Sequence, residues 1–285
     1  MPVKVDTLQG LLARYREALG TRYSEGEIKA ITRSLAQHVI GLDPAQLELK
    51  KFESLNESDA LRMHKPLERL IAGEPLQHIL GEVEFHGLRL KVSREVLIPR
   101  PETEELVERI IASGIAPKRI VDVGTGSGCI ALALKKAYPE AQVWGVDVSR
   151  MALEIACTNA ERNGLEVDWQ QADVLADDFA FADELEIVVS NPPYIPSGEA
   201  DLLDEHVRSF EPHVALFAPD ADPLLFYRVI GEKAWSALCP GGHIWFEGHW
   251  RHAQAVGDLL SSIGYSDVRV VKDMDGQDRF IHGRR

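Results

Sequence analysis

The stretch that decides the fold is Val121-Asp122-Val123-Gly124-Thr125-Gly126-Ser127-Gly128, in which a short apolar run ends in a glycine-rich turn. A segment with the character of a helix, residues 129–137, follows directly. Because glycine has no Cβ atom, the backbone of such a turn can pass close beside a ligand. An apolar strand, a glycine turn and a helix in this order predict the first unit of an α/β sheet that binds a ligand at the carboxyl ends of its strands.

Strands and helices continue to alternate on the C-terminal side of this turn. Short apolar strands are predicted at residues 120–123, 142–146, 187–190 and 243–246, and helices at 129–137, 151–163, 224–238 and 253–263. This alternation predicts a parallel, doubly wound sheet, which places the chain in the α/β class. Two closing strands, at 268–271 and 279–282, have no helix between them and predict an antiparallel pair at one edge.

The N-terminal part of the chain has a different pattern. Apolar residues recur at helical spacing through the first 75 residues, and Gly73-Glu74-Pro75 ends that pattern. Residues 83–92 alternate apolar and polar on both sides of Gly87, which predicts a β-hairpin. We therefore expect a helical domain at 1–76, a hairpin linker at 77–97 and the α/β domain at 98–285.

The charge of the chain limits its partners. The formal net charge is -14, whereas residues 1–80 carry 11 basic and 11 acidic side chains, so the negative charge lies in the α/β domain. An acidic domain binds a phosphate backbone poorly, which argues against bulk DNA or RNA as a partner. The three scattered cysteines, the lack of an apolar leader and the lack of a long apolar run predict a soluble, cytoplasmic protein with no membrane contact.

Acidic residues at the ends of the predicted strands indicate what the crevice binds. Asp122 suits a cationic sulfonium better than a pyrophosphate, and the spacing is GxGxG rather than the dinucleotide GxGxxG. Asp147 ends the second strand and could accept from both ribose hydroxyls. Asp173 could accept from an adenine amino group, and Val174 could pack on the ring. These features predict a nucleoside cofactor and favour a sulfonium over NAD, which stays the alternative. The candidate cofactor-binding residues are Asp122, Gly124, Thr125, Gly126, Ser127, Gly128, Asp147, Asp173 and Val174.

A second motif, Asn191-Pro192-Pro193-Tyr194, follows the fourth strand and faces the same crevice. Asn191 offers a side-chain carbonyl acceptor. Pro193 has no N–H and keeps Pro192 extended, which holds out the Pro192 carbonyl as a second acceptor. Two fixed acceptors match the two hydrogens of a planar –NH₂ group, and Tyr194 offers an aromatic face to stack on it. We expect these residues to hold a planar nitrogen in line with a methyl group, with Asn191, Pro192 and Tyr194 as the catalytic residues and Pro193 as a further substrate contact.

With these motifs the sequence resembles the glutamine-N5 methyltransferases that modify peptide chain release factors, over nearly its whole length. The matching segments are residues 73–92, 97–107 (LIPRPETEELV), 122–134, 189–195, 210–216 (FEPHVAL), 240–247 and 272–280. The resemblance implies a class I (Rossmann-like) methyltransferase fold with a seven-stranded, mostly parallel sheet, and S-adenosylmethionine as cofactor, with Asn191 also lining the cofactor.

The resemblance also implies the substrate, which is the glutamine of the Gly-Gly-Gln motif in bacterial class 1 release factors. The helical domain would then recognise the release factor, and the chain is expected to act as a monomer. One departure occurs at residues 217–223, FAPDADP, where many relatives carry a glycine-rich stretch. A ribosomal protein glutamine and the adenine N6 of DNA or RNA are the alternative substrates, and the RPETE segment favours release factors.

Several nearby residues admit two interpretations. Arg100 and Glu102 could form a surface ion pair or part of the rim of the cofactor site. Glu247 could support the site or cap the following helix. His249 and His252 have a possible metal spacing, but no acidic or cysteine partner completes the set, so no metal is expected.

Overall fold

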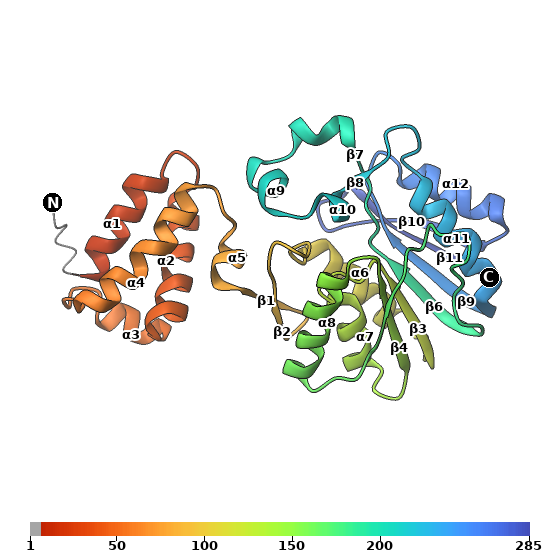
Figure 1. The fold of residues 1–285 in the computed structure, drawn as a ribbon, viewed down its shortest axis with the longest axis horizontal. Coiled ribbons are helices and arrows are strands. Elements are labelled where there is room, and N and C mark those ends of the chain that lie inside the picture. The colour runs from red at the N-terminus through yellow and green to blue at the C-terminus, as the bar shows by residue number, and fades with distance from the viewer. Residues whose placement is uncertain (1–6) are drawn as a thin grey trace. The chain divides into compact units, whose positions relative to one another are not determined.

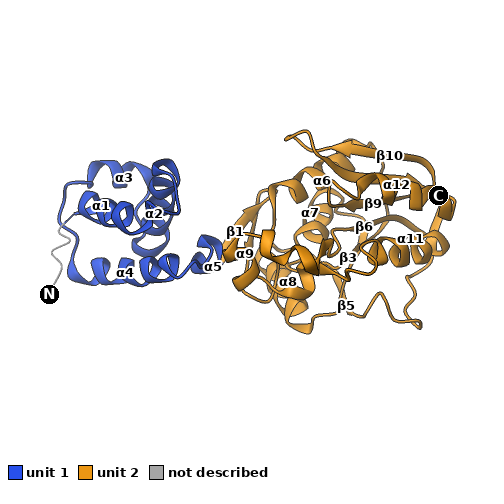
Figure 2. Cartoon of the chain, turned by 90° about the horizontal axis from the view of Figure 1, so that it is seen from above, with its two compact units in different colours: residues 1–81 blue, residues 82–285 orange. Residues whose placement is uncertain are grey.

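The computed structural model describes residues 7–285 of the chain and divides into two compact units, residues 1–81 and 82–285 (Figure 2). The sequence suggested a division near residue 76, whereas the units separate after Gly81. Among the described residues, no helix is long and apolar enough to cross a membrane.

The regular elements of the smaller unit, within residues 7–81, are five helices. They are α1 (Leu8–Leu19), α2 (Glu25–Ile40), α3 (Pro44–Leu49), α4 (Glu57–Ile71) and α5 (Leu76–Leu80). Buried apolar residues of α1, α2 and α4 form one core, and the Tyr15 hydroxyl donates to the Met63 carbonyl oxygen inside it at 2.7 Å. The side chains of Asp43 and Asn56 cap α3 and α4. Helix α5 was not predicted, because its five residues are too few to show a helical period.

The predicted hairpin is present and belongs to the larger unit. Strands β1 (Glu82–Phe85) and β2 (Leu88–Lys91) are antiparallel and are joined by His86 and Gly87, both with positive φ, as a tight two-residue turn requires. Asn159 and Asn163, one turn apart on α8 (Arg150–Asn163), each exchange two hydrogen bonds with the backbone of β2, at Lys91 and Arg89 respectively. The hairpin is thus fastened to the α/β fold by side chains that continue its ladder.

The larger unit has a seven-stranded sheet of order β10-β11-β9-β6-β3-β4-β5, in which β11 runs in the direction opposite to the other six strands. Its strands are β3 (Arg119–Val123), β4 (Gln142–Asp147), β5 (Asp168–Gln171), β6 (Leu185–Ser190), β9 (Leu238–Glu247), β10 (Ser266–Lys272) and β11 (Asp278–Arg284). The prediction of a mostly parallel, seven-stranded α/β sheet with an antiparallel pair at one edge is confirmed.

Helices cover both faces of this sheet (Figure 1). Helices α6 (Pro101–Ala112) and α7 (Cys129–Ala137) pack on one face, and α11 (Leu225–Ala237) and α12 (Ala253–Ile263) on the other. Neighbouring residues of β3, Ile120 and Val121, are therefore buried in different cores. The central strands are apolar at successive positions because both of their faces are buried. Burying each such side chain contributes about 1.5–3 kcal/mol to the free energy of folding.

The segment between β6 and α11 contains short elements that the sequence did not predict. They are β7 (Ile195–Pro196), the 3₁₀ helix η1 (Ser197–Leu202), α9 (Glu205–Phe210), α10 (His213–Leu216) and β8 (Phe217–Ala218). β7 and β8 pair in parallel, and the Gly198 N–H donates to the Asp220 carboxylate at 2.8 Å. The 217–223 segment is therefore tied to the residues that directly follow the Asn-Pro-Pro-Tyr motif.

Candidate active site

A cavity of about 270 Å³ opens where β3, β4 and β6 end. The turns after these three parallel strands meet at one edge of the sheet, as expected for ligand sites in open α/β folds. Of the predicted site residues, the cavity is lined by Gly124, Gly126, Asp147, Asp173, Val174, Asn191, Pro192 and Pro193. Asp122, Thr125, Ser127, Gly128 and Tyr194 do not line it.

Glycine is needed at the three positions of the turn for different structural reasons. All three have positive φ, of 71° at Gly124, 55° at Gly126 and 81° at Gly128. A Cβ built at Gly124 or Gly126 meets no protein atom within 4 Å, whereas one at Gly128 would lie 2.9 Å from the Trp169 ring. Gly124 and Gly126 therefore leave open space beside the cavity, and Gly128 is required by packing under the turn.

Asp122 holds the turn from beneath. Its side chain is fully buried, and Oδ2 accepts from the Thr125 hydroxyl at 2.6 Å and from the Ala131 N–H at 3.2 Å. Burial raises the pKa of this carboxyl to about 7. Oδ1 has no hydrogen-bond partner, so a buried acceptor stands unsatisfied beneath a turn that could receive a cation.

Asp147 connects the turn to the next strand. Its Oδ2 accepts from the Gly126 N–H at 2.8 Å and its Oδ1 from the Ser149 N–H at 2.9 Å. Desolvation raises the pKa of this carboxyl, although backbone hydrogen bonds partly oppose the shift. Each oxygen keeps a lone pair free for a ligand hydroxyl. Beside it, Asp173 is exposed and Val174 is buried, so the cavity has a polar and an apolar wall.

The Asn-Pro-Pro-Tyr motif is anchored at both ends. Before it, the Ser190 hydroxyl donates to the Val123 carbonyl oxygen at 2.7 Å, which ties the ends of β6 and β3 together. Asn191 Nδ2 donates to the Thr103 hydroxyl oxygen at 3.2 Å. The Tyr194 hydroxyl lies 3.5 Å from the Glu247 carboxylate, which is buried at the end of β9. Glu247 therefore contacts the motif's tyrosine rather than capping the following helix, whose start has no side-chain cap.

Sequence reasoning missed one whole wall of the cavity. This wall consists of residues 95–97, Pro212, Val214 and Ala215. Its apolar side is completed by Phe226 and Ile230 of α11. Glu211 fastens this wall, because its carboxylate accepts from the Ile98 N–H at 3.1 Å and pairs with Arg100. The FEP element, residues 210–212, was the available signal for this wall, but nothing local to it reveals a partner more than a hundred residues earlier.

Arg100 and Glu102 do not form the ion pair that was one of the two interpretations. Arg100 pairs with Glu211 instead, and helix α6 already begins at Pro101, which places Glu102 in its first turn. A glutamate there faces the positive end of the helix dipole. Within residues 7–285, no group of three His, Cys, Asp or Glu side chains is arranged to hold a metal ion.

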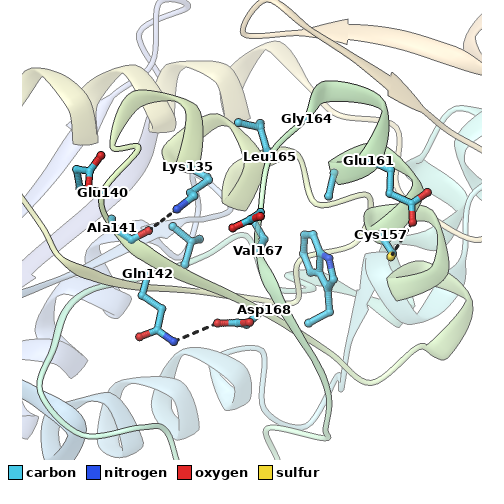
Figure 3. A pocket seen from close by; sticks show the side chains of 14 residues that line it. Lys135, Glu140, Ala141, Gln142, Cys157, Glu161, Gly164, Leu165, Val167 and Asp168 are labelled. Atoms are coloured by element: carbon cyan, nitrogen blue, oxygen red, sulfur yellow. Dashed lines mark hydrogen bonds between the residues drawn. The ribbon is translucent and has the colours of Figure 1, made fainter.

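A wider groove lies away from this site, along the edge strand β5 and helix α8 (Figure 3). Its side chains bond to one another, as Gln142 does with Asp168 at 3.1 Å, and Lys135 donates to the Ala141 carbonyl oxygen at 2.8 Å. It contains none of the predicted site residues. The cavity at the carboxyl edge is therefore the candidate active site.

The sheet order, the glycine turn, the acid after the second strand and the Asn-Pro-Pro-Tyr motif together define an S-adenosylmethionine-dependent methyltransferase. The family model described as methyltransferase small domain matches residues 101–208, and the model described as PrmC N-terminal domain matches residues 10–81. The chain belongs to the release factor glutamine methyltransferase family.

Relatives of that name match most of the chain. The release factor glutamine methyltransferase of Bacteroides thetaiotaomicron is 38% identical over 275 residues, which are 96% of this chain and 99% of that relative. That of Flavobacterium psychrophilum is 37% identical over 280 residues, 95% of this chain and 98% of the relative. A methyltransferase crystal structure from Pyrococcus furiosus has a TM-score of 0.51 at 19% identity, and the match covers 70% of this chain and 89% of that chain. That similarity supports the fold.

Proposed function

We propose that this protein transfers a methyl group from S-adenosylmethionine to the side-chain amide nitrogen of the glutamine in the Gly-Gly-Gln motif of bacterial class 1 release factors. Its main support in the structure is that Asn191, Pro192 and Pro193 line the same cavity as the glycine turn and Asp147. The names of the relatives at 36–40% identity support the choice of substrate.

The residues of the cavity fit the proposed cofactor. Asp147 offers two acceptor oxygens for ribose hydroxyls, and Asp173 offers one for an adenine amino group, beside the apolar Val174. Gly124 and Gly126 leave open space where a ligand would pass the turn. The Asp147 and Asp173 carboxyl groups line the cavity, and acidic groups there favour a cation over a phosphate. When bound, S-adenosylmethionine supplies an electrophilic methyl carbon.

The residues of the motif act by positioning. An amide nitrogen attacks poorly because its lone pair is delocalised. The Asn191 side-chain oxygen and the Pro192 carbonyl would accept its two N–H bonds, which turns the nitrogen toward the methyl carbon, and Tyr194 would pack against the amide plane. Holding the reacting atoms about 3–3.5 Å apart makes the transfer a unimolecular step, which lowers the entropic part of its barrier. With the cofactor bound, the amide nitrogen would form the new C–N bond as the carbon–sulfur bond breaks, and one N–H proton would pass to water.

The helical unit has a separate role in this proposal. Its 11 basic and 11 acidic side chains up to residue 80 leave it without net charge, in contrast to the acidic α/β unit. We propose that it recognises the release factor protein and that one chain acts alone, without nucleic acid.

One experiment tests the proposal against its alternatives. Purified protein is supplied with labelled S-adenosylmethionine and, in parallel, a release factor, the same factor with alanine in place of the Gly-Gly-Gln glutamine, a ribosomal protein pool, and DNA. Label on the unaltered factor alone is expected. Label on the alanine variant would refute the proposal, and so would label on a ribosomal protein or on DNA instead of the release factor. Asn191→Ala is expected to abolish transfer and to leave cofactor binding nearly intact.

A further inference from the structure

Two buried side chains outside the Asn-Pro-Pro-Tyr motif contact it through a continuous chain of hydrogen bonds. Asn191 Nδ2 lies 3.2 Å from Thr103 Oγ1, and Thr103 Oγ1 lies 2.7 Å from Glu247 Oε2. Thr103 is on the first turn of α6 and Glu247 ends β9, so neither adjoins the motif in the sequence. We infer that Thr103 and Glu247 are positioning residues, which orient the Asn191 side-chain amide with its oxygen toward the substrate. This inference rests on the proposed function.

The direction of each hydrogen bond follows from what each group can do. An ionised carboxylate only accepts, so the Thr103 O–H must donate to Glu247. A hydroxyl has a single proton, so the Thr103 oxygen can then only accept from Asn191. The Asn191 –NH₂ group therefore faces Thr103, and its carbonyl oxygen is left for a donor in the cavity. With the amide reversed, two acceptors would face each other at Thr103, and the –NH₂ group would confront the –NH₂ group of the substrate.

Glu247 is itself held in place from several directions. It is 1% exposed, its backbone carbonyl accepts from the Tyr227 hydroxyl at 3.2 Å, and its Oε1 lies 3.5 Å from the Tyr194 hydroxyl. The carboxylate therefore contacts both ends of the motif, directly at Tyr194 and through Thr103 at Asn191. A buried network of this kind fixes orientation because each member has one satisfied arrangement.

Protonation of Glu247 would remove that constraint. Burial raises the pKa of its carboxyl to about 7. The charged and titratable groups around it are Glu102, Cys129, Tyr194, Tyr227 and Arg279. A protonated Glu247 can donate to Thr103, which frees the threonine hydroxyl to donate to Asn191 and makes the reversed amide equally satisfied. The turnover rate should therefore fall as the pH decreases through about 7.

The test uses the full chain, S-adenosylmethionine and a release factor. Thr103→Val removes the hydroxyl at nearly constant shape, Thr103→Ser keeps it, and Thr158→Val is the matched control, because its exposed hydroxyl bonds only within α8. Thr103→Val should lower kcat about 10- to 100-fold, a smaller loss than is typical when a direct transition-state donor is removed. Its KM for S-adenosylmethionine should stay within about twofold of the wild-type value. Thr103→Ser should recover most of the loss. An unchanged kcat in Thr103→Val would overturn the inference.

Two further measurements test this inference separately from the proposed function. Glu247→Gln, whose amide can either donate or accept, should have low kcat without the decline below pH 7, and a persisting decline would count against the inference. In asparagine-selective ¹⁵N spectra, the Asn191 side-chain signal, assigned by its loss in Asn191→Ala, should be protected from hydrogen exchange in wild type and Thr103→Ser but not in Thr103→Val. Equal protection in all three refutes the inference whatever the substrate. If the wild-type protein binds cofactor but does not methylate the release factor, the proposed function alone is refuted.

Discussion

The Gly126 backbone N–H donates to the Asp147 carboxylate at 2.8 Å, so the glycine turn after β3 and the acid at the end of β4 form one hydrogen-bonded unit. The second oxygen of Asp147 accepts from the Ser149 N–H at the start of α8. Both oxygens are thus fixed by backbone donors before any ligand arrives. A carboxylate fixed in this way loses little conformational entropy when it binds two hydroxyls.

Asp147→Asn should weaken the binding of S-adenosylmethionine about 10- to 100-fold, because a hydrogen bond to a charged group contributes about 1.5–3 kcal/mol. Its remaining oxygen can still accept from the Gly126 N–H, but its –NH₂ group then faces the Ser149 N–H, so the thermal midpoint should also fall modestly. Isothermal titration calorimetry measures the affinity. Asp168→Asn on the adjacent strand, whose carboxylate bonds only to Gln142 on the surface, is the control. Equal affinities in all three proteins would show that Asp147 does not contact the cofactor.

Gly126→Ala and Gly128→Ala should separate ligand binding from folding. Both place a Cβ on a backbone of positive φ, which costs roughly 1–2 kcal/mol. Only the second drives that Cβ to 2.9 Å from Trp169 and 3.1 Å from Ala156. Gly128→Ala should therefore lose more stability in chemical denaturation, and Gly126→Ala should lose relatively more cofactor affinity. The reverse order of stabilities would contradict the distinction drawn between the two glycines.

Asp122 should contribute stability that is lost as the pH rises from about 4 to about 7. The folded-state pKa of Asp122, about 7, lies above its unfolded value of 3.8. The folded state therefore binds more protons than the unfolded state between these values, and the free energy of unfolding falls with increasing pH. Glu247 contributes in the same direction. The difference between wild type and Asp122→Asn, followed by urea denaturation from pH 4.5 to 8.5, isolates Asp122. An unchanged slope in the variant would exclude the assigned shift.

The parts of the site that were predictable from the sequence are those with local signals. Gly124 and Asn191 directly follow a strand and Asp147 ends one. Because the carboxyl ends of parallel strands meet at one edge, their convergence follows from the topology. Helices α7 and α12 begin and end at the predicted residues. Helix α7 starts directly after the glycine turn, and α12 ends before Gly264.

The parts that were not predictable depend on contacts between distant segments. Thr103 meets Glu247 across 144 positions of sequence, and Glu211 meets Ile98 across 113. A buried hydroxyl or carboxylate has no periodicity that reveals its partner. For the same reason the sequence did not show that Gly128 packs against Trp169 or that Asp122 lies beneath the turn.

Glu211 provides the last prediction, because one side chain links two segments that wall the cavity. It is 4% exposed, and Arg100 pairs with it while Ile98 donates to it. Glu211→Ala should cost about 1–3 kcal/mol, because it leaves the Ile98 N–H without its acceptor, while the half-buried Arg100 can still be hydrated. Cofactor affinity should fall as well, because Leu97 and Pro212 of these segments line the cavity.

The control is Asp201→Ala, which removes a similar ion pair, with Arg208, from the surface. That aspartate side chain is 93% exposed, so its loss should cost no more than about 1 kcal/mol. Glu211→Gln should fall between the two, because its amide oxygen can still accept from Ile98 while the charge opposite Arg100 is gone. Equal losses of stability for Glu211→Ala and Asp201→Ala, measured by urea denaturation, would mean that the wall is held by packing and not by Glu211.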